Sequence, residues 1–221
     1  MRLPNSAHTS HPWRIHELTR DFRVEDVWAL PTPGGPGDFP LLVDGFASGD
    51  TSEAPSLPAR VLWALRWKLG ELFGWDDESS GIGERVVTLR DRMSADLLEA
   101  PRGPSLQKLP FTPLYLLEDE WAAEIANSTM HGVMHLGWVA DGDGGHRGQM
   151  AVLVKPNGPL GEAYMAAIQP FRHLIVYPAM MRQIERRWAQ RDPGRLAAAS
   201  ARSDRSAADS PRAAPPSRRA A

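Results

Sequence analysis

The sequence contains no cysteine, which excludes disulfides, thiolate nucleophiles and zinc sites with thiolate ligands. Long apolar runs are also missing, because the longest nearly apolar stretch, residues 174–181, is too short to cross a bilayer. The first five residues are not followed by the apolar core of a signal peptide. We therefore expect a cytoplasmic protein that has no membrane partner.

Lysine is scarce, with three residues against 22 arginines, and the charge is unevenly distributed. Residues 194–221 hold six arginines and two aspartates, so the net charge of −2 divides into +4 there and −6 in the remainder. An acidic body argues against nucleic acid as a partner. Residues 192–221 are mainly Ala, Arg, Ser and Pro and have little to bury. We expect a single domain over residues 1–191, followed by a disordered tail.

The beginning of the chain predicts short elements and a loop. Alternating side chains in residues 13–18 favour a strand. Residues 24–30 follow a possible cap at Asp21, carry two acidic residues at their start and favour a short helix. Proline and glycine dominate residues 31–40, which predicts a loop.

Two further helices are expected before the middle of the chain. Leucines at helical spacing predict a helix over residues 58–73, with Trp63 and Trp67 on an adjoining face. Residues 91–100 favour a short helix, which ends where proline and glycine break the chain.

The second half of the chain reads as a meander of strands. Strand patterns occur over residues 111–117, 121–128, 129–139 and 148–155. The glycine-rich residues 141–145 predict a hairpin turn between the last two. Pro113 places the first of these strands at an edge or a strand start, because proline cannot donate to a strand ladder.

A long helix with a sustained apolar stripe is predicted over residues 160–188. Pro170 and Pro178 each remove an intrahelical hydrogen bond and should kink or segment it. The expected fold class is α+β: a curved antiparallel sheet, a long C-terminal helix across it, and extra N-terminal helices. Such an arrangement leaves room for a pocket between sheet and helix.

Methionine and aromatic side chains gather where this pocket is expected. The candidate apolar residues are Met130, Met134, Trp138, Met150, Val152, Tyr164, Phe171 and Met181. The polar groups that could orient a ligand beside them are Gln149, Arg172, His173 and Tyr177. Methionine fills irregular core gaps and also lines promiscuous apolar sites. The pattern therefore agrees both with a packed core and with a ligand-binding cavity.

Three motifs that resemble known binding sites fail on chemistry. His131 and His135 have the spacing of zinc ligands on a helix, but on a strand they lie about 13 Å apart. We expect each to be partly exposed or to make a single hydrogen-bonding contact. Residues 141–145 begin like a calcium loop and then lack oxygen ligands, and residues 31–40 lack the lysine and the free N–H groups of a phosphate loop. No metal and no cofactor are expected.

Several segments resemble a bacterial group, domain-of-unknown-function family 2867. They are residues 12–16, 21–31, 65–70, 131–138, 150–158 and 164–173. The resemblance covers roughly residues 2–190 and implies the helix-grip fold of the START/Bet v 1-like superfamily, in which a sheet wraps a long C-terminal helix around an apolar cavity. It supplies no catalytic residues, and the Pro-rich insert of this chain departs from a minimal helix-grip.

Three hypotheses of function follow. The first is a domain that binds a hydrophobic small molecule between sheet and C-terminal helix. The second is a cyclase- or hydrolase-like enzyme that uses His173 or Tyr177 as acid or base in the same cavity. The third is an interaction module that uses the tryptophans of the first half and the basic tail. The oligomeric state does not follow from the sequence.

Overall fold

The computed structural model describes residues 1–48, 86–106, 109–127, 129–142 and 144–191, and of residues 160, 164 and 171 the backbone alone. The helix predicted over residues 58–73, with Trp63 and Trp67, lies outside these ranges, as does the tail over residues 192–221.

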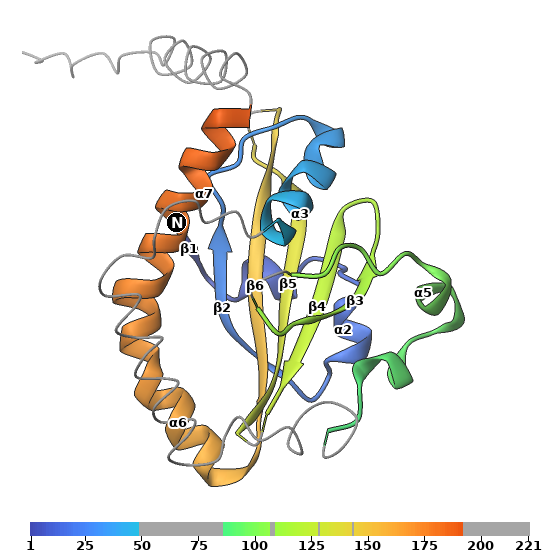
Figure 1. Cartoon of the computed structure of the whole chain (residues 1–221), viewed down its shortest axis with the longest axis vertical. Coiled ribbons are helices and arrows are strands. Elements are labelled where there is room, and N and C mark those ends of the chain that lie inside the picture. Colours follow the sequence, from blue (N-terminus) through green and yellow to red (C-terminus); the bar gives the residue numbers. More distant parts are fainter. Residues whose placement is uncertain (49–85, 107–108, 128, 143, 192–221) are drawn as a thin grey trace, which may run out of the picture.

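Six antiparallel strands form one curved sheet, in the order β1-β2-β6-β5-β4-β3 (Figure 1). The strands are β1 Arg2–Leu3, β2 Arg23–Ala29, β3 Thr112–Leu116, β4 Glu120–Ala126, β5 Met130–Ala140 and β6 His146–Pro156. The four strands of the predicted meander are thus confirmed, and β3, which contains Pro113, lies at an edge. Gly142 and Gly144 turn the β5–β6 hairpin with φ angles of +88° and +80°, which glycine adopts without strain.

Helices flank the sheet, and the longest two of those described follow its last strand. They are α1 Ser6–Thr9, α2 Ile15–Leu18, α3 Phe39–Ala47, α5 Ala95–Glu99, α6 Gly158–Phe171 and α7 Tyr177–Arg191, with 3₁₀ turns η1 Pro36–Asp38 and η3 Leu89–Arg92. A π-helical turn, η4 Arg172–Val176, joins α6 to α7, so the two run as one long bent helix beside the sheet (Figure 1). The predicted C-terminal helix and its segmentation between Pro170 and Pro178 are confirmed. None of the described helices is long and apolar enough to cross a membrane.

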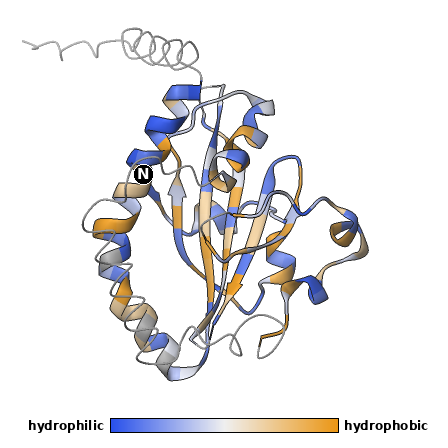
Figure 2. Ribbon diagram, viewed as in Figure 1, coloured by the Kyte–Doolittle hydropathy of each residue, from blue (hydrophilic) through white to orange (hydrophobic). Residues whose placement is uncertain are grey.

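Both faces of the sheet carry a hydrophobic core, and strand alternation assigns each residue to one of them. Figure 2 shows hydrophobic residues along the central strands of the sheet. Val133 packs with the residues of α2, η3 and α5 on one face. Met134, its neighbour, packs with α3 and α7 on the other. The face toward α3 and α7 corresponds to the pocket expected from the sequence.

Two predictions near the N-terminus are wrong. Residues 13–18 contain the short helix α2 instead of a strand, and residues 24–30 lie largely in strand β2 instead of a helix. On one side β2 pairs with β6, at least 120 residues further along the chain, so no local pattern reports this pairing. The loop expected over residues 31–40 ends early, because α3 begins at Phe39.

Candidate ligand-binding site

A pocket of about 170 Å³ lies between α7, α3 and strand β5. The apolar residues that line it are Leu42, Phe46, Leu106, Leu109, Met134, Met180, Ile184 and Trp188. Gly45, Gln183, Arg187 and Arg191 complete its wall. The walls are formed mostly by carbon atoms, with a few polar groups contributed by one helix. Mostly apolar walls with a few polar groups are also typical of pockets that bind small molecules in other proteins.

Two hydrogen bonds hold the end of α7 over this pocket. Trp188 Nε1 donates to the carbonyl oxygen of Pro33 at 2.9 Å. Arg191 donates to the carbonyl oxygen of Leu41, at the start of α3. The Trp188 ring also lies 6.1 Å from that of Trp138 on β5. α7 and α3 are therefore tied together around the pocket without filling it.

A cluster of polar side chains lies at the π-helical turn, and Asp26 of β2 is its centre. The Asp26 side chain is 1% exposed. It accepts hydrogen bonds from Tyr177 Oη at 2.9 Å, from His173 Nε2 at 2.5 Å and from Arg172. Arg2 is a more distant ion-pair partner, at 3.7 Å. A buried carboxylate is thus compensated by several donors, as its desolvation requires.

Tyr177 connects the polar cluster to the apolar face. Its hydroxyl donates to Asp26 and accepts from Arg172 at 3.0 Å, while its ring packs on Trp28 with a centroid separation of 4.7 Å. Burial raises the pKa of Tyr177, so its hydroxyl stays protonated. Burial acts to lower the pKa of Arg172, but Tyr177 and Asp26 raise it overall, so the guanidinium stays charged. In this state Asp26 fixes the orientation of His173 through Nε2, and Nδ1 is the ring nitrogen left for other contacts.

A family model described as Protein of unknown function (DUF2867) matches residues 18–179. The chain belongs to the DUF2867 family. The matched range contains Asp26 and the π-helical turn, and it ends near the start of α7, before Ile184 and Trp188. Searches of curated proteins and of solved structures give no significant match.

The structure brings only part of the predicted site of this DUF2867 protein together. Met134 lines the pocket, while Trp138, Met150 and Tyr177 belong to the core cluster beside it, and Val152 packs against that cluster. Met181 also packs against it. His173 and Arg172 lie at the Asp26 cluster. Met130, half-buried, begins β5 away from the pocket lining, and the side chains of Tyr164 and Phe171 lie outside the described part.

Gln149 does not belong to this site. It alternates with Met150 along β6 and contacts the carbonyl oxygen of Ala7, which packs on the opposite face. The expectation that Gln149 orients a ligand in the pocket is therefore wrong. The reason is the period of two along a strand, which sends neighbouring side chains to opposite faces.

The structure adds functional candidates that the sequence interpretation missed. Asp26 was assigned to a helix, although Asp26 and Trp28 lie on one face of β2 and Val27 between them on the other, as residues of a strand do. Leu42 and Phe46 come from α3, which was not expected at all. The alternation around Asp26 was the signal that could have identified it.

The opposite face of the DUF2867 sheet holds a second buried polar network. His135 Nε2 donates to Glu120 at 2.8 Å, and His135 Nδ1 lies 3.2 Å from His8 Nε2. Burial lowers the pKa of His135 and that of His8, the latter to about 2, so both rings are neutral. Burial acts to raise the pKa of Glu120, but hydrogen bonds from His135, Arg14 N–H and Tyr115 lower it overall, so Glu120 is ionised. This network fixes α1 against the sheet.

His131 forms a separate pair with Glu124, at 2.8 Å. His131 and His135 are thus buried instead of partly exposed, because each has a carboxylate partner on β4. Among the described residues no group of three or more His, Asp or Glu is placed to hold a metal ion.

Proposed function

We propose that this protein is a helix-grip domain that binds a small hydrophobic molecule between its sheet and its C-terminal helix. The observation that carries the proposal is the apolar pocket of about 170 Å³ under α7. An apolar protein cavity of about 150 Å³ stays dry and admits benzene, so a ligand built around one ring fits this volume.

The topology supports the helix-grip part of the proposal. β2 pairs with β6, the last strand of the meander, and the C-terminal helix follows β6 directly. Its second half, α7, then packs across the face that carries Met134 and Trp138. A sheet with a long terminal helix across one face is the arrangement that the fold requires.

Toluene is a suitable probe for this proposal, because it matches the pocket in size and carries no charge. We expect toluene to shift the NMR signals of methyl groups at Met134, Met180 and Ile184. Ile184→Phe fills the pocket and should abolish these shifts, whereas Leu41→Phe, at an exposed position of α3, should leave them unchanged. Toluene shifts that persist in Ile184→Phe, or their absence from the unaltered protein, would rule the proposal out.

A second candidate function is general-base catalysis, and the Asp26–His173 pair favours it. A carboxylate that fixes one nitrogen of an imidazole leaves the other to take a proton from a substrate or a water. We expect His173→Asn and Asp26→Asn to lose hydrolysis of p-nitrophenyl acetate together, whereas Glu25→Gln keeps it. Equal rates in all four proteins would eliminate this candidate.

The third hypothesis, an interaction module, depends on the tryptophans of the first half and on the tail. Trp13 and Trp28 are buried in the core and offer no exposed surface to a partner. Trp63, Trp67 and the tail lie outside the described part of the chain, and no observation in that part favours the hypothesis.

A further inference from the structure

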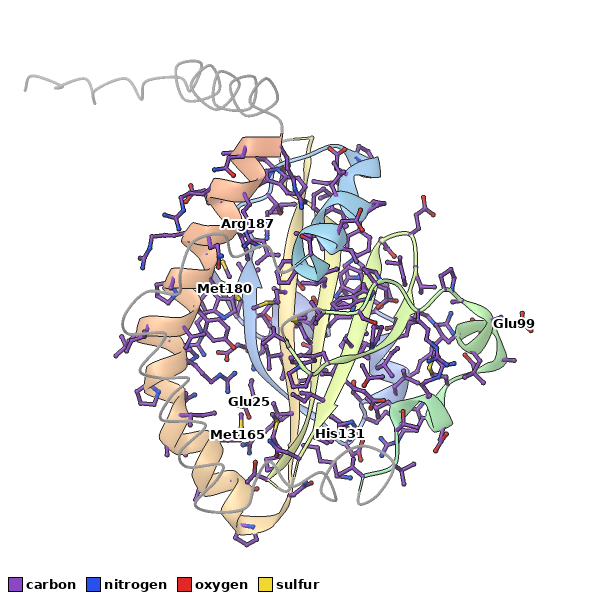
Figure 3. The ribbon with its side chains drawn as sticks, viewed as in Figure 1. Glu25, Glu99, His131, Met165, Met180 and Arg187 are labelled. Atoms are coloured by element: carbon purple, nitrogen blue, oxygen red, sulfur yellow. The ribbon has the colours of Figure 1, made fainter. Side chains whose placement is uncertain are left out.

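Arg187 has a buried nitrogen in the wall of the apolar pocket. Its Nη2 atom is buried and has no hydrogen-bond partner among the described residues. Figure 3 shows Arg187 on α7, two turns beyond Met180 on the side toward the sheet. A guanidinium carries its charge at every physiological pH, and a buried donor without an acceptor is strongly destabilising. A ligand in the pocket can therefore supply the hydrogen-bond acceptor that Arg187 lacks among the described residues.

We propose that the ligand of the pocket carries a carboxylate that binds Arg187, with its apolar body against Leu106, Met134 and Ile184. The inference rests on the proposed function and names the chemical class of the ligand. It predicts an aromatic or short-chain carboxylic acid of about one ring, since the volume of about 170 Å³ holds little more.

The charges around the pocket favour an anion. Its described lining includes Arg187 and Arg191 and contains no carboxylate. Arg191 is already bonded to the carbonyl oxygen of Leu41, so Arg187 is the guanidinium with a buried nitrogen to offer. Glu185 precedes Arg187 by two residues, about 200° around the helix, and is exposed. Asp44 of α3 is also exposed.

A helix dipole opposes the positive charge of Arg187 and Arg191 but does not cancel it. α3 ends near the pocket at Ala47, and its C-terminus carries about half a negative charge. Two guanidinium groups carry two full positive charges. The balance at the pocket is therefore positive, and a carboxylate can form a bidentate pair with Arg187.

Phenylacetate and phenylacetamide provide the test, because they have the same shape and differ in charge. Their dissociation constants are measured by NMR titration or calorimetry of the full chain, beside those of toluene. We expect phenylacetate to bind at least about tenfold more tightly than phenylacetamide, as a charge-assisted hydrogen bond provides. Arg187→Gln should abolish this difference and leave toluene affinity within about threefold. Arg182→Gln, at an exposed position of the same helix, should preserve it.

Each outcome bears on a separate part of the proposal. Equal affinities for phenylacetate and phenylacetamide in the unaltered protein would overturn the role of Arg187. Toluene binding in the same protein would still support the proposed pocket. Failure of all three compounds to bind would overturn the proposed function and this inference with it. Arg187→Lys keeps the charge but loses the bidentate geometry, so it should retain part of the preference even if Arg187→Gln fails to fold. No preference in a folded Arg187→Lys protein would also contradict the assignment.

Discussion

His8 is a buried histidine on the face of the sheet away from the pocket, and it makes stability depend on pH. Burial, together with the neighbouring His135, lowers its pKa to about 2, against about 6.5 in an unfolded chain. Unfolding therefore takes up a proton at any pH between these values. The stability is fully present above pH 6.5 and is lost as the pH falls toward 2, by about 1.4 kcal/mol per pH unit for one proton.

We predict that His8→Leu reduces the number of protons taken up on unfolding by about one, which makes the free energy of unfolding less dependent on pH. Urea unfolding at several pH values between 4.5 and 6.5 measures this change. The lowered pKa values of Glu120 and Glu124 affect stability mainly below this window. His135, whose pKa is also lowered, should keep part of the slope in the variant. Identical slopes in the two proteins would show that His8 is charged in the folded state.

The π-helical turn is the element that assembles the Asp26 cluster. Arg172 and Tyr177 both bind Asp26, yet they are five residues apart and would lie about 140° apart around a regular α-helix. A π turn, with hydrogen bonds from i to i+5, brings such residues to one face. Pro178 contributes, because it cannot donate to the carbonyl of Leu174. Leu174, 76% exposed, projects away from the cluster as the additional residue of the turn.

We predict that deletion of Leu174 is tolerated, whereas deletion of Ala179 is not. Without Leu174, Arg172 precedes Tyr177 by four residues and stays on the same face of a regular helix, so the free energy of unfolding should change by no more than about 1 kcal/mol. Without Ala179, Ile184 and Trp188 rotate by about 100° away from the core, which should destabilise by more than about 3 kcal/mol. Chemical denaturation compares the two. A severe loss on deletion of Leu174 would mean that the π turn itself is required.

Local pattern predicted those elements whose partners are close in sequence. Strands β5 and β6 were found by alternation, and their turn by its glycines, because a hairpin depends on neighbouring residues. β2 was missed because Glu25 and Asp26 resemble the acidic first turn of a helix. The hydrogen-bond donors to Asp26 are His173 and Tyr177, about 150 residues away.

The residues of the candidate site also fall into those that a local pattern predicts and those that depend on tertiary contacts. Met134 was predicted to face the pocket because it lies on an alternating strand face, and Tyr177 was named as a polar group beside the pocket. Leu42 and Phe46 were not, since the packing of α3 over β5 is a tertiary contact. Arg187 lies on a helix surface rich in arginine, and its exceptional property, a buried nitrogen without a partner among the described residues, exists only in the folded arrangement.

At the scale of the whole molecule, the C-terminal helix closes one of the two cores. α7 adds Tyr177, Met180 and Ile184 to the cluster that α3 and the sheet begin. In the described part of the chain, its last anchors are the bonds from Trp188 to Pro33 and from Arg191 to Leu41. The core over α3 is therefore incomplete until residue 191 has been added, and on this basis we propose that the folded domain ends there.

We predict that a chain ending at Arg191 has the free energy of unfolding of the full chain within about 0.5 kcal/mol, because residues 192–221 are mainly small and polar and have little apolar surface to bury. A chain ending at Gln183 removes Ile184, Trp188 and Arg191, and it should lose at least about 3 kcal/mol together with toluene binding. Thermal and urea unfolding of the three chains, each at the same concentration, measure both effects. If the chain ending at Arg191 is markedly less stable than the full chain, residues beyond 191 take part in the fold and the proposed domain boundary is wrong.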